Sequence, residues 1–162
     1  MLLEEKEELL PKDVYEREDH MLEVIDSIVN NSRTKLGFSK GAGQTYDAIL
    51  TTSSINKALN YYDLIKKVKS GETDIRVEEK TKRVLPDFPK VAITYSISEN
   101  EESSSKEQDK MREILGDYNK QFGTNFTLET MRAYNRNIND RLSRKKREVL
   151  SPFRTIRFSD RC

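Results

Sequence analysis

The sequence is poor in the residues on which many self-sufficient enzymes and disulfide-bonded domains depend. It has no tryptophan, one histidine (His20) and one cysteine, Cys162. A lone cysteine allows no disulfide within the chain, so nothing indicates an oxidising compartment. One histidine without an internal cysteine argues against a zinc site, and a Ser-His-Asp triad has no support. We therefore expect no catalytic residue and no metal site.

Long apolar runs are also missing. No segment approaches the roughly 20 apolar residues that a membrane span needs, and the acidic first residues do not resemble a signal peptide. Hydrophobic residues are 35% of the chain and charged residues another 35%, where roughly 25% charged is usual in a globular domain. We expect a soluble, cytoplasmic protein without a membrane partner, whose thin core is normally supported by neighbouring domains.

The charge that is present is unevenly distributed. Residues 1–30 carry ten acids and three bases, whereas residues 132–162 carry ten bases and three acids. The basic end can meet phosphates, or it can pair with the acidic end of the same chain. The candidate basic patch consists of Arg132, Arg136, Arg144, Lys145 and Lys146.

Two short apolar runs, residues 46–52 and 90–96, predict buried β-strands. Ser54 is placed to cap a helix between them, and this helix is expected to end near Gly71. The charged stretch 72–89 contains two prolines and predicts an irregular connection. Because strand, helix and strand follow one another, we expect a parallel βαβ unit. Two strands alone would make an unfinished sheet, since parallel sheets are normally covered on both faces.

Three further helices are predicted around this unit from the spacing of apolar residues. One covers residues 13–29, a second ends before Gly123, and Thr127 caps a third. The polar stretch 98–105 between the second strand and these last helices predicts a flexible loop.

The glycine-rich loop from Gly37 to Gly43 does not fit a phosphate-binding loop. The Gly-x4-Gly-Lys-Ser/Thr spacing is not met, because Ala42 stands where the second glycine is needed. The loop also precedes a strand, whereas a phosphate-binding loop follows a strand and opens a helix. We therefore expect no nucleotide or other cofactor on this chain.

Four hydroxyl side chains, Thr51 to Ser54, mark the end of the first predicted strand. Ligands of open α/β sheets bind at the carboxyl ends of strands. The following helix offers free amides, the positive end of its dipole, and Lys57 one turn later. These groups suit a nucleic-acid phosphate, although helix capping alone would also explain the hydroxyls. The candidate phosphate contacts are Thr52, Ser53, Ser54 and Lys57.

Three segments resemble the restriction (R) subunits of type I restriction-modification enzymes, at the start of their second RecA-like motor domain. The first begins Asp47-Ala-Ile-Leu-Thr-Thr-Ser-Ser-Ile-Asn-Lys, and the second is Val91-Ala-Ile-Thr-Tyr-Ser. The third and most specific is Asp117-Tyr-Asn-Lys-Gln-Phe-Gly-Thr-Asn-Phe-Thr, followed by Tyr134. The segment around His20 resembles the helix that enters this domain.

The resemblance extends from Pro11 to Lys146 and implies a helix-rich α/β fold. Specifically, it implies an incomplete RecA-like (P-loop NTPase-type) parallel sheet with flanking helices. We accordingly divide the chain into entering linker helices (1–32), a partial second motor domain (33–146) and a divergent tail (147–162) that we expect to be disordered.

The resemblance also implies a fragment of an ATP-dependent translocase and endonuclease that defends against foreign DNA. Its partners would be double-stranded DNA and the modification and specificity subunits. ATP and magnesium would belong to the parent enzyme, since the phosphate loop and nuclease carboxylates of the family are missing here. In such motors the turn after the first strand of this domain approaches the DNA backbone, which again points to the four candidate contacts.

After Lys146 the sequence departs from the family. A Thr-Gly-Phe-Asp-type motif and an arginine-bearing motif that reaches ATP would follow there. This chain reads Arg147-Glu-Val-Leu-Ser-Pro-Phe instead, as in a truncated or frameshifted reading frame. Three functions are therefore open: a partial R subunit that is inactive alone, a non-enzymatic DNA-binding or adaptor module that uses the basic C-terminal helix, and a product without function.

Overall fold

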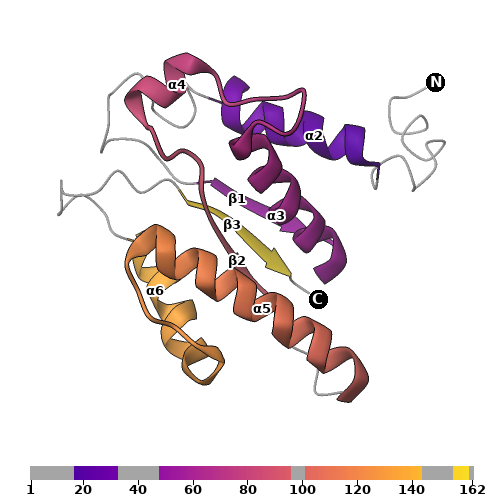
Figure 1. Ribbon diagram of the computed structural model, residues 1–162, viewed down its shortest axis with the longest axis vertical. Coiled ribbons are helices and arrows are strands. Elements are labelled where there is room, and N and C mark those ends of the chain that lie inside the picture. Colours follow the sequence, from indigo (N-terminus) through magenta and orange to yellow (C-terminus); the bar gives the residue numbers. More distant parts are fainter. Residues whose placement is uncertain (1–16, 33–47, 96–100, 144–154, 161–162) are drawn as a thin grey trace, which may run out of the picture.

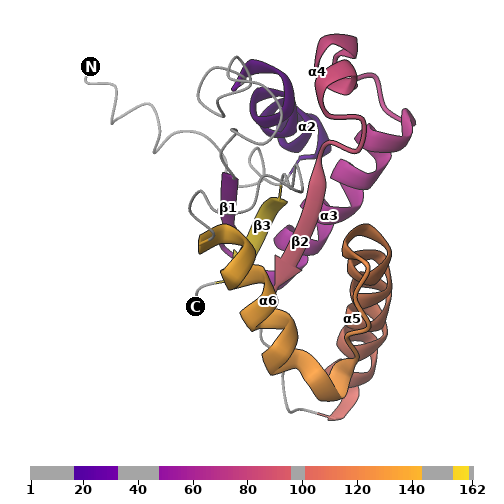
Figure 2. The same cartoon turned by 90° about the vertical axis from the view of Figure 1, so that its left-hand side faces the viewer.

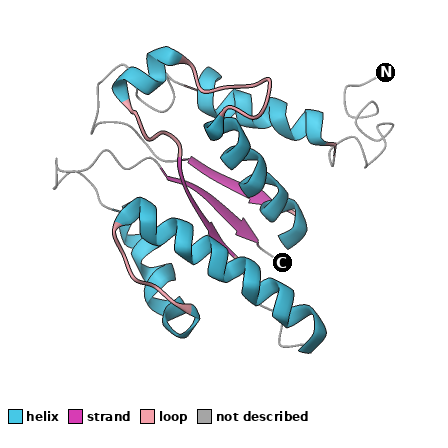
Figure 3. Cartoon of the chain, viewed as in Figure 1, coloured by secondary structure: helices cyan, strands magenta, loops and turns pink. Residues whose placement is uncertain are grey.

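The computed structural model describes residues 17–32, 48–95, 101–143 and 155–160 (Figure 1). Helices predominate around a small sheet, as expected for a helix-rich α/β protein (Figure 3). In chain order the elements are α2 (Glu18–Asp26), the π-helical turn η2 (Ser27–Asn31), β1 (Ala48–Thr52), α3 (Ile55–Ser70), α4 (Glu79–Val84), β2 (Lys90–Thr94), α5 (Glu101–Phe122), the 3-10 turn η4 (Leu128–Thr130), α6 (Met131–Ser143) and β3 (Thr155–Asp160). The loop from Gly37 to Gly43 and the start of the first predicted helix lie outside the described residues.

The three strands form one parallel sheet in the order β1-β3-β2. The last strand lies between the first two, so that Ile156 is paired with Ala48 on one side and with Val91 on the other. The prediction of a disordered tail is therefore wrong for residues 155–160. Strands β1 and β2 each run parallel to β3 but do not pair with each other. Strand β3 supplies the hydrogen-bonding partners for the edges of β1 and β2 that face it.

Helix α3 begins and ends where the sequence predicts. The hydroxyl oxygen of Ser54 accepts a hydrogen bond from the backbone N–H of Lys57 at 3.2 Å. Gly71 follows the helix with a φ of 80°, a left-handed conformation that glycine adopts without steric cost. The buried face of α3 consists of Ala58, Tyr61, Tyr62, Leu64, Ile65 and Val68. This apolar stripe packs the helix against the sheet.

The connection between α3 and β2 is more regular than its charge and prolines predict. It contains α4, so the prediction of an irregular segment is wrong there. Val77 and Leu85 are buried on either side of α4 and anchor the connection in the core. The Asn30 amide donates to the backbone oxygen of Arg76 at 2.8 Å and accepts from the N–H of Glu78 at 3.0 Å. Packing and these hydrogen bonds therefore outweigh the local composition.

Helices α5 and α6 diverge next to β2 (Figure 2). Helix α5 starts at Glu101, so the predicted loop over 98–105 is wrong for residues 101–105, where two glutamates and three serines form the first turn of the helix. Gly123 ends α5 with a φ of 65°, as predicted. The predicted capping role of Thr127 is also confirmed, because its side chain accepts from the backbone of Thr130 while its own N–H donates to the Thr130 hydroxyl at 2.8 Å.

Side chains of α5 and α6 close the outer edge of β2. The Gln121 amide accepts from the N–H of Val91 at 3.0 Å and donates to its carbonyl at 3.4 Å. The buried Tyr134 hydroxyl donates to the carbonyl of Ile93 at 2.7 Å. The opposite strand is more open, since the Ile49 side chain of β1 is 61% exposed. The core therefore lies on the β2 side and under α3.

Candidate functional site

The carboxyl ends of the three parallel strands meet at one end of the sheet, which we call the carboxyl end. There Thr51 and Thr94, from the two outer strands, are both paired with Ser159 of β3. Helix α3 begins three residues after β1 ends, so its amino terminus lies at this same end (Figure 1). The end thus combines hydroxyl residues with the positive end of a helix dipole.

Thr52 shapes the turn that carries the other candidate contacts. It is only 7% exposed, and its hydroxyl donates to the backbone oxygen of Ser54 at 2.9 Å. In this position Thr52 holds the chain between β1 and α3 in one conformation. A direct contact of Thr52 with phosphate stays a prediction.

Ser53, Ser54 and Lys57 are better placed to meet a ligand. Both serines are exposed, and Lys57 is half-buried with no ion pair among the residues that the structure describes. The hydroxyl of Ser54 caps the helix as an acceptor, which leaves its own O–H available to donate. Capping therefore occupies the backbone N–H of Lys57 but leaves the O–H of Ser54 for a phosphate. Backbone amides, two hydroxyl groups and one ammonium group are the donors that anion sites at helix amino termini use.

The predicted basic patch is seen only in part. Arg132 and Arg136 are exposed on α6 and lie one turn apart on the same face. The other members of the patch are outside the described residues: Arg144, Lys145 and Lys146.

Arg141 of α6 makes contacts within the protein that hold α6 against α5. Its Nε donates to the Tyr118 hydroxyl at 3.1 Å and to Asn137 Oδ1 at 2.8 Å. Its guanidinium lies 4.3 Å from the centre of the Phe122 ring, a cation–π distance. This arginine ties α6 to α5 and is not counted among the residues available to DNA.

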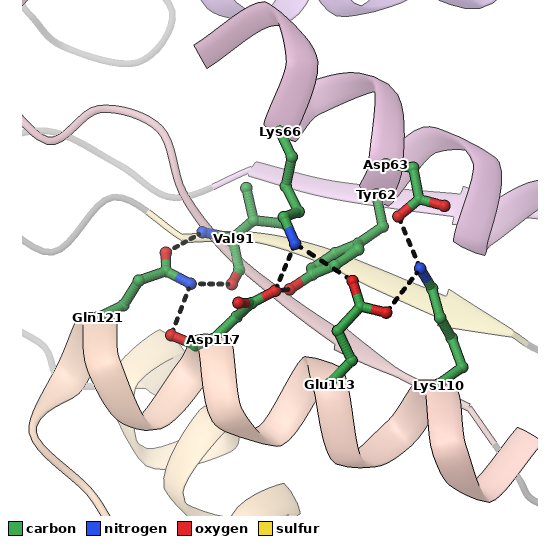
Figure 4. A network of polar contacts seen from close by, with 8 residues as sticks. All are labelled: Tyr62, Asp63, Lys66, Val91, Lys110, Glu113, Asp117 and Gln121. Atoms are coloured by element: carbon green, nitrogen blue, oxygen red, sulfur yellow. Dashed lines mark hydrogen bonds and ion pairs between the residues drawn. The ribbon is translucent and has the colours of Figure 1, made fainter. Parts of the chain in front are cut away.

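A polar network between α3 and α5 was not predicted (Figure 4). Lys66 bonds Asp117 at 2.7 Å and Glu113 at 3.3 Å, and the Tyr62 hydroxyl donates to Asp117 at 2.7 Å. Further along, Lys110 bonds Asp63 at 2.8 Å and Glu113 at 3.2 Å. Charged residues at helical spacing on two segments were the available signal, but sequence alone does not show that the two helices face each other.

The network keeps Tyr62 protonated and Lys66 charged. Burial raises the pKa of Tyr62, and the hydrogen bond to Asp117 raises it further. Burial lowers the pKa of Lys66, but its bonds to Asp117 and Glu113 outweigh this and leave the pKa raised. A protonated tyrosine and a charged lysine cannot act as general base or nucleophile near neutral pH. The network is therefore suited to holding the two helices together.

Within the described ranges, no group of three His, Cys, Asp or Glu side chains could hold a metal ion. His20 is half-buried near the start of α2. No helix in the described part of the chain is both long and apolar enough to cross a membrane.

Residues 44–152 match the family described as type I restriction enzyme subunit R domain 3. No curated protein matches the chain. The matched region starts just before β1 and includes α3 to α6, together with the candidate contact turn. It ends at residue 152, somewhat beyond the end at Lys146 that the resemblance predicted. Since this region is well over half of the 162 residues, the chain belongs to the family of type I restriction enzyme R subunits, as part of their domain 3.

Proposed function

We propose that this chain is the part of a type I restriction enzyme R subunit that contacts the backbone of double-stranded DNA. The observation that carries the proposal is the turn from Ser53 to Lys57. It is exposed, rich in donors and located at the carboxyl end of a parallel sheet, where ligands of such sheets bind. The parallel sheet with flanking helices supports a partial RecA-like motor fold.

One phosphate group can be held at this turn without any contact to a base. The free N–H groups at the start of α3 point away from the helix, and its dipole favours negative charge there. The Ser53 and Ser54 hydroxyls can donate to phosphate oxygens, and the Lys57 ammonium supplies the countercharge. Such contacts position a protein on the duplex and carry no sequence information. Binding should therefore be independent of sequence, as a moving translocase requires.

The remaining functions of the parent enzyme are proposed for its other parts. ATP, magnesium and the nuclease reaction would be handled outside this chain, beside modification and specificity subunits. We therefore expect the chain alone, in its cytoplasmic setting, to show neither ATP hydrolysis nor DNA cleavage. A DNA-stimulated ATPase assay of the purified chain checks this, and turnover above background would contradict it.

A titration of fluorescent duplex DNA at low salt tests the contact directly. Lys57→Ala should weaken binding about tenfold on every sequence, since one charged hydrogen bond contributes about 1.5–3 kcal/mol. Lys67→Ala is the matched control, because Lys67 is exposed at the other end of the same helix. Equal losses for both variants would show that only overall charge matters and would contradict a site at the turn.

A second candidate is a DNA-binding or adaptor surface on α6. It is favoured by the exposure of Arg132 and Arg136 on one helical face. The double variant Arg132→Gln/Arg136→Gln distinguishes the two proposals in the same titration. If it abolishes binding while Lys57→Ala leaves binding unchanged, the surface on α6 is the one that meets DNA.

A further inference from the structure

A hollow of about 330 Å³ lies at the amino end of the sheet, opposite the proposed DNA contact. It is lined by the last turns of α3 and α5 and by the start of β2. Its lining residues are Tyr62, Ile65, Lys66, Lys69, Ser70, Pro89, Val91, Asp117, Lys120 and Gln121. The volume is at the lower end of the roughly 300–1,000 Å³ typical of small-molecule sites.

The polar groups on the floor of the hollow are already satisfied. Asp117 accepts hydrogen bonds from Tyr62 and Lys66. The Gln121 amide bonds both backbone groups of Val91. These groups form a fixed boundary, and the buried side chains of Tyr62, Pro89 and Val91 add an apolar wall.

Two lysines at the rim of the hollow differ from these groups, because their charges are not paired within the described ranges. Lys69 and Lys120 are exposed, and neither forms an ion pair with the residues that the structure describes. Partial burial lowers the pKa of Lys69, and the nearby charge of Lys90 acts in the same direction, against the opposite effect of Asp87. A negative group at the rim would offset both effects and stabilise the charged ammonium.

Lysines in the last turn of a helix also complement the negative end of its dipole, which is the simplest explanation of their presence. That explanation applies equally to Lys67, which is exposed in the same turn but does not line the hollow. It does not account for an apolar wall enclosed by two helices and bordered by two unpaired cations.

We propose that this hollow binds a small organic anion, with its phosphate or carboxylate between Lys69 and Lys120 and its apolar or aromatic body against Pro89 and Val91. The site is separate from the proposed DNA contact, because the hollow lies at the start of β2 and the contact lies after the end of β1, at opposite ends of the sheet. A ligand here would touch α3 and α5 together.

Amide chemical shifts of the ¹⁵N-labelled full chain, titrated with phenyl phosphate, test the proposal. We expect saturable shifts at Ser70 and Gln121. Phenyl phosphate should bind more tightly than either inorganic phosphate or phenol, because only it uses both the lysines and the apolar wall. Lys69→Gln and Lys120→Gln should each weaken its binding about tenfold, the usual effect of one charged hydrogen bond. Lys67→Gln is the matched control and should change nothing.

Several outcomes would overturn the proposal. They are the absence of saturable shifts, equal weakening by Lys67→Gln, or equal affinity for phenol or inorganic phosphate. The spectrum of each variant without ligand shows whether it is folded. Lys69→Gln should leave duplex DNA binding unchanged, so the result is independent of the proposed DNA contact; joint loss of both activities would show that the hollow is part of the DNA surface instead.

Discussion

The two ends of the sheet offer positive charge in different ways. At the carboxyl end, the amino terminus of α3 supplies it from the backbone, so short hydroxyl side chains and Lys57 suffice beside it. At the amino end, α3 and α5 present their carbonyl termini, which are partially negative. There the positive charge comes from the side chains of Lys66, Lys69 and Lys120. Because α3 places its positive end at the carboxyl end of the sheet and its negative end at the amino end, lysine side chains must supply more of the positive charge at the amino end.

The largest expected effect is on the strands that support both ends. Ile93 of β2 is fully buried, whereas Ile49 of β1 is 61% exposed. Ile93→Ala should lower the free energy of unfolding by about 2–5 kcal/mol, because it removes buried methyl groups and leaves a cavity. Ile49→Ala, the same change at an exposed position, should cost about 0.5 kcal/mol or less. Urea unfolding compares the two, and similar losses would show that β1 is buried in solution.

A smaller effect is expected when the amino end alone is disturbed. Asp117→Ala should cost about 1–3 kcal/mol of unfolding free energy, because the buried Tyr62 hydroxyl loses its acceptor and Lys66 loses its partner. Asp109→Ala is the control on the same helix, since the exposed Asp109–Arg112 pair contributes only about 0–1 kcal/mol. If thermal unfolding shows equal losses, the network does not hold α3 to α5.

The smallest effect is expected at the carboxyl end. Ser54→Ala should cost about 1 kcal/mol through loss of the helix cap, while Ser53→Ala should leave stability nearly unchanged. Both should weaken DNA binding slightly if the hydroxyls contact phosphate. Urea unfolding and DNA titration of the two variants separate capping from binding. Weaker binding by Ser54→Ala alone would indicate that the hydroxyls matter only for the cap.

Local signals predicted much of this fold. Ser54, Gly71, Gly123 and Thr127 each mark a helix boundary through an interaction within a few residues, and all four were read correctly from sequence. The strands that begin at Ala48 and Lys90 also follow local apolar runs. Such signals depend on short-range geometry, which a sequence contains.

The missing part depends on distant contacts. Residues 155–160 follow a break in family resemblance, and although Thr155 to Ser159 alternate polar and apolar residues, their place between two other strands depends on contacts far along the chain. The hollow and the network likewise require α3 and α5 to face each other, through contacts that span 47 to 55 positions of sequence. The candidate DNA contacts came from the turn and the resemblance, and their role is still a prediction.

The salt dependence of duplex DNA binding tests the central claim most directly. With roughly four to six phosphate contacts, from the turn and the predicted basic patch together, affinity should fall by about 10²–10³ between about 50 and 200 mM salt. For Lys57→Ala the slope of log affinity against log salt should be smaller by about 0.9, the value for one lost phosphate contact, whereas Lys67→Ala should keep the original slope. Binding that is indifferent to salt, or a slope that Lys57→Ala leaves unchanged, would contradict a phosphate contact at the carboxyl end of the sheet.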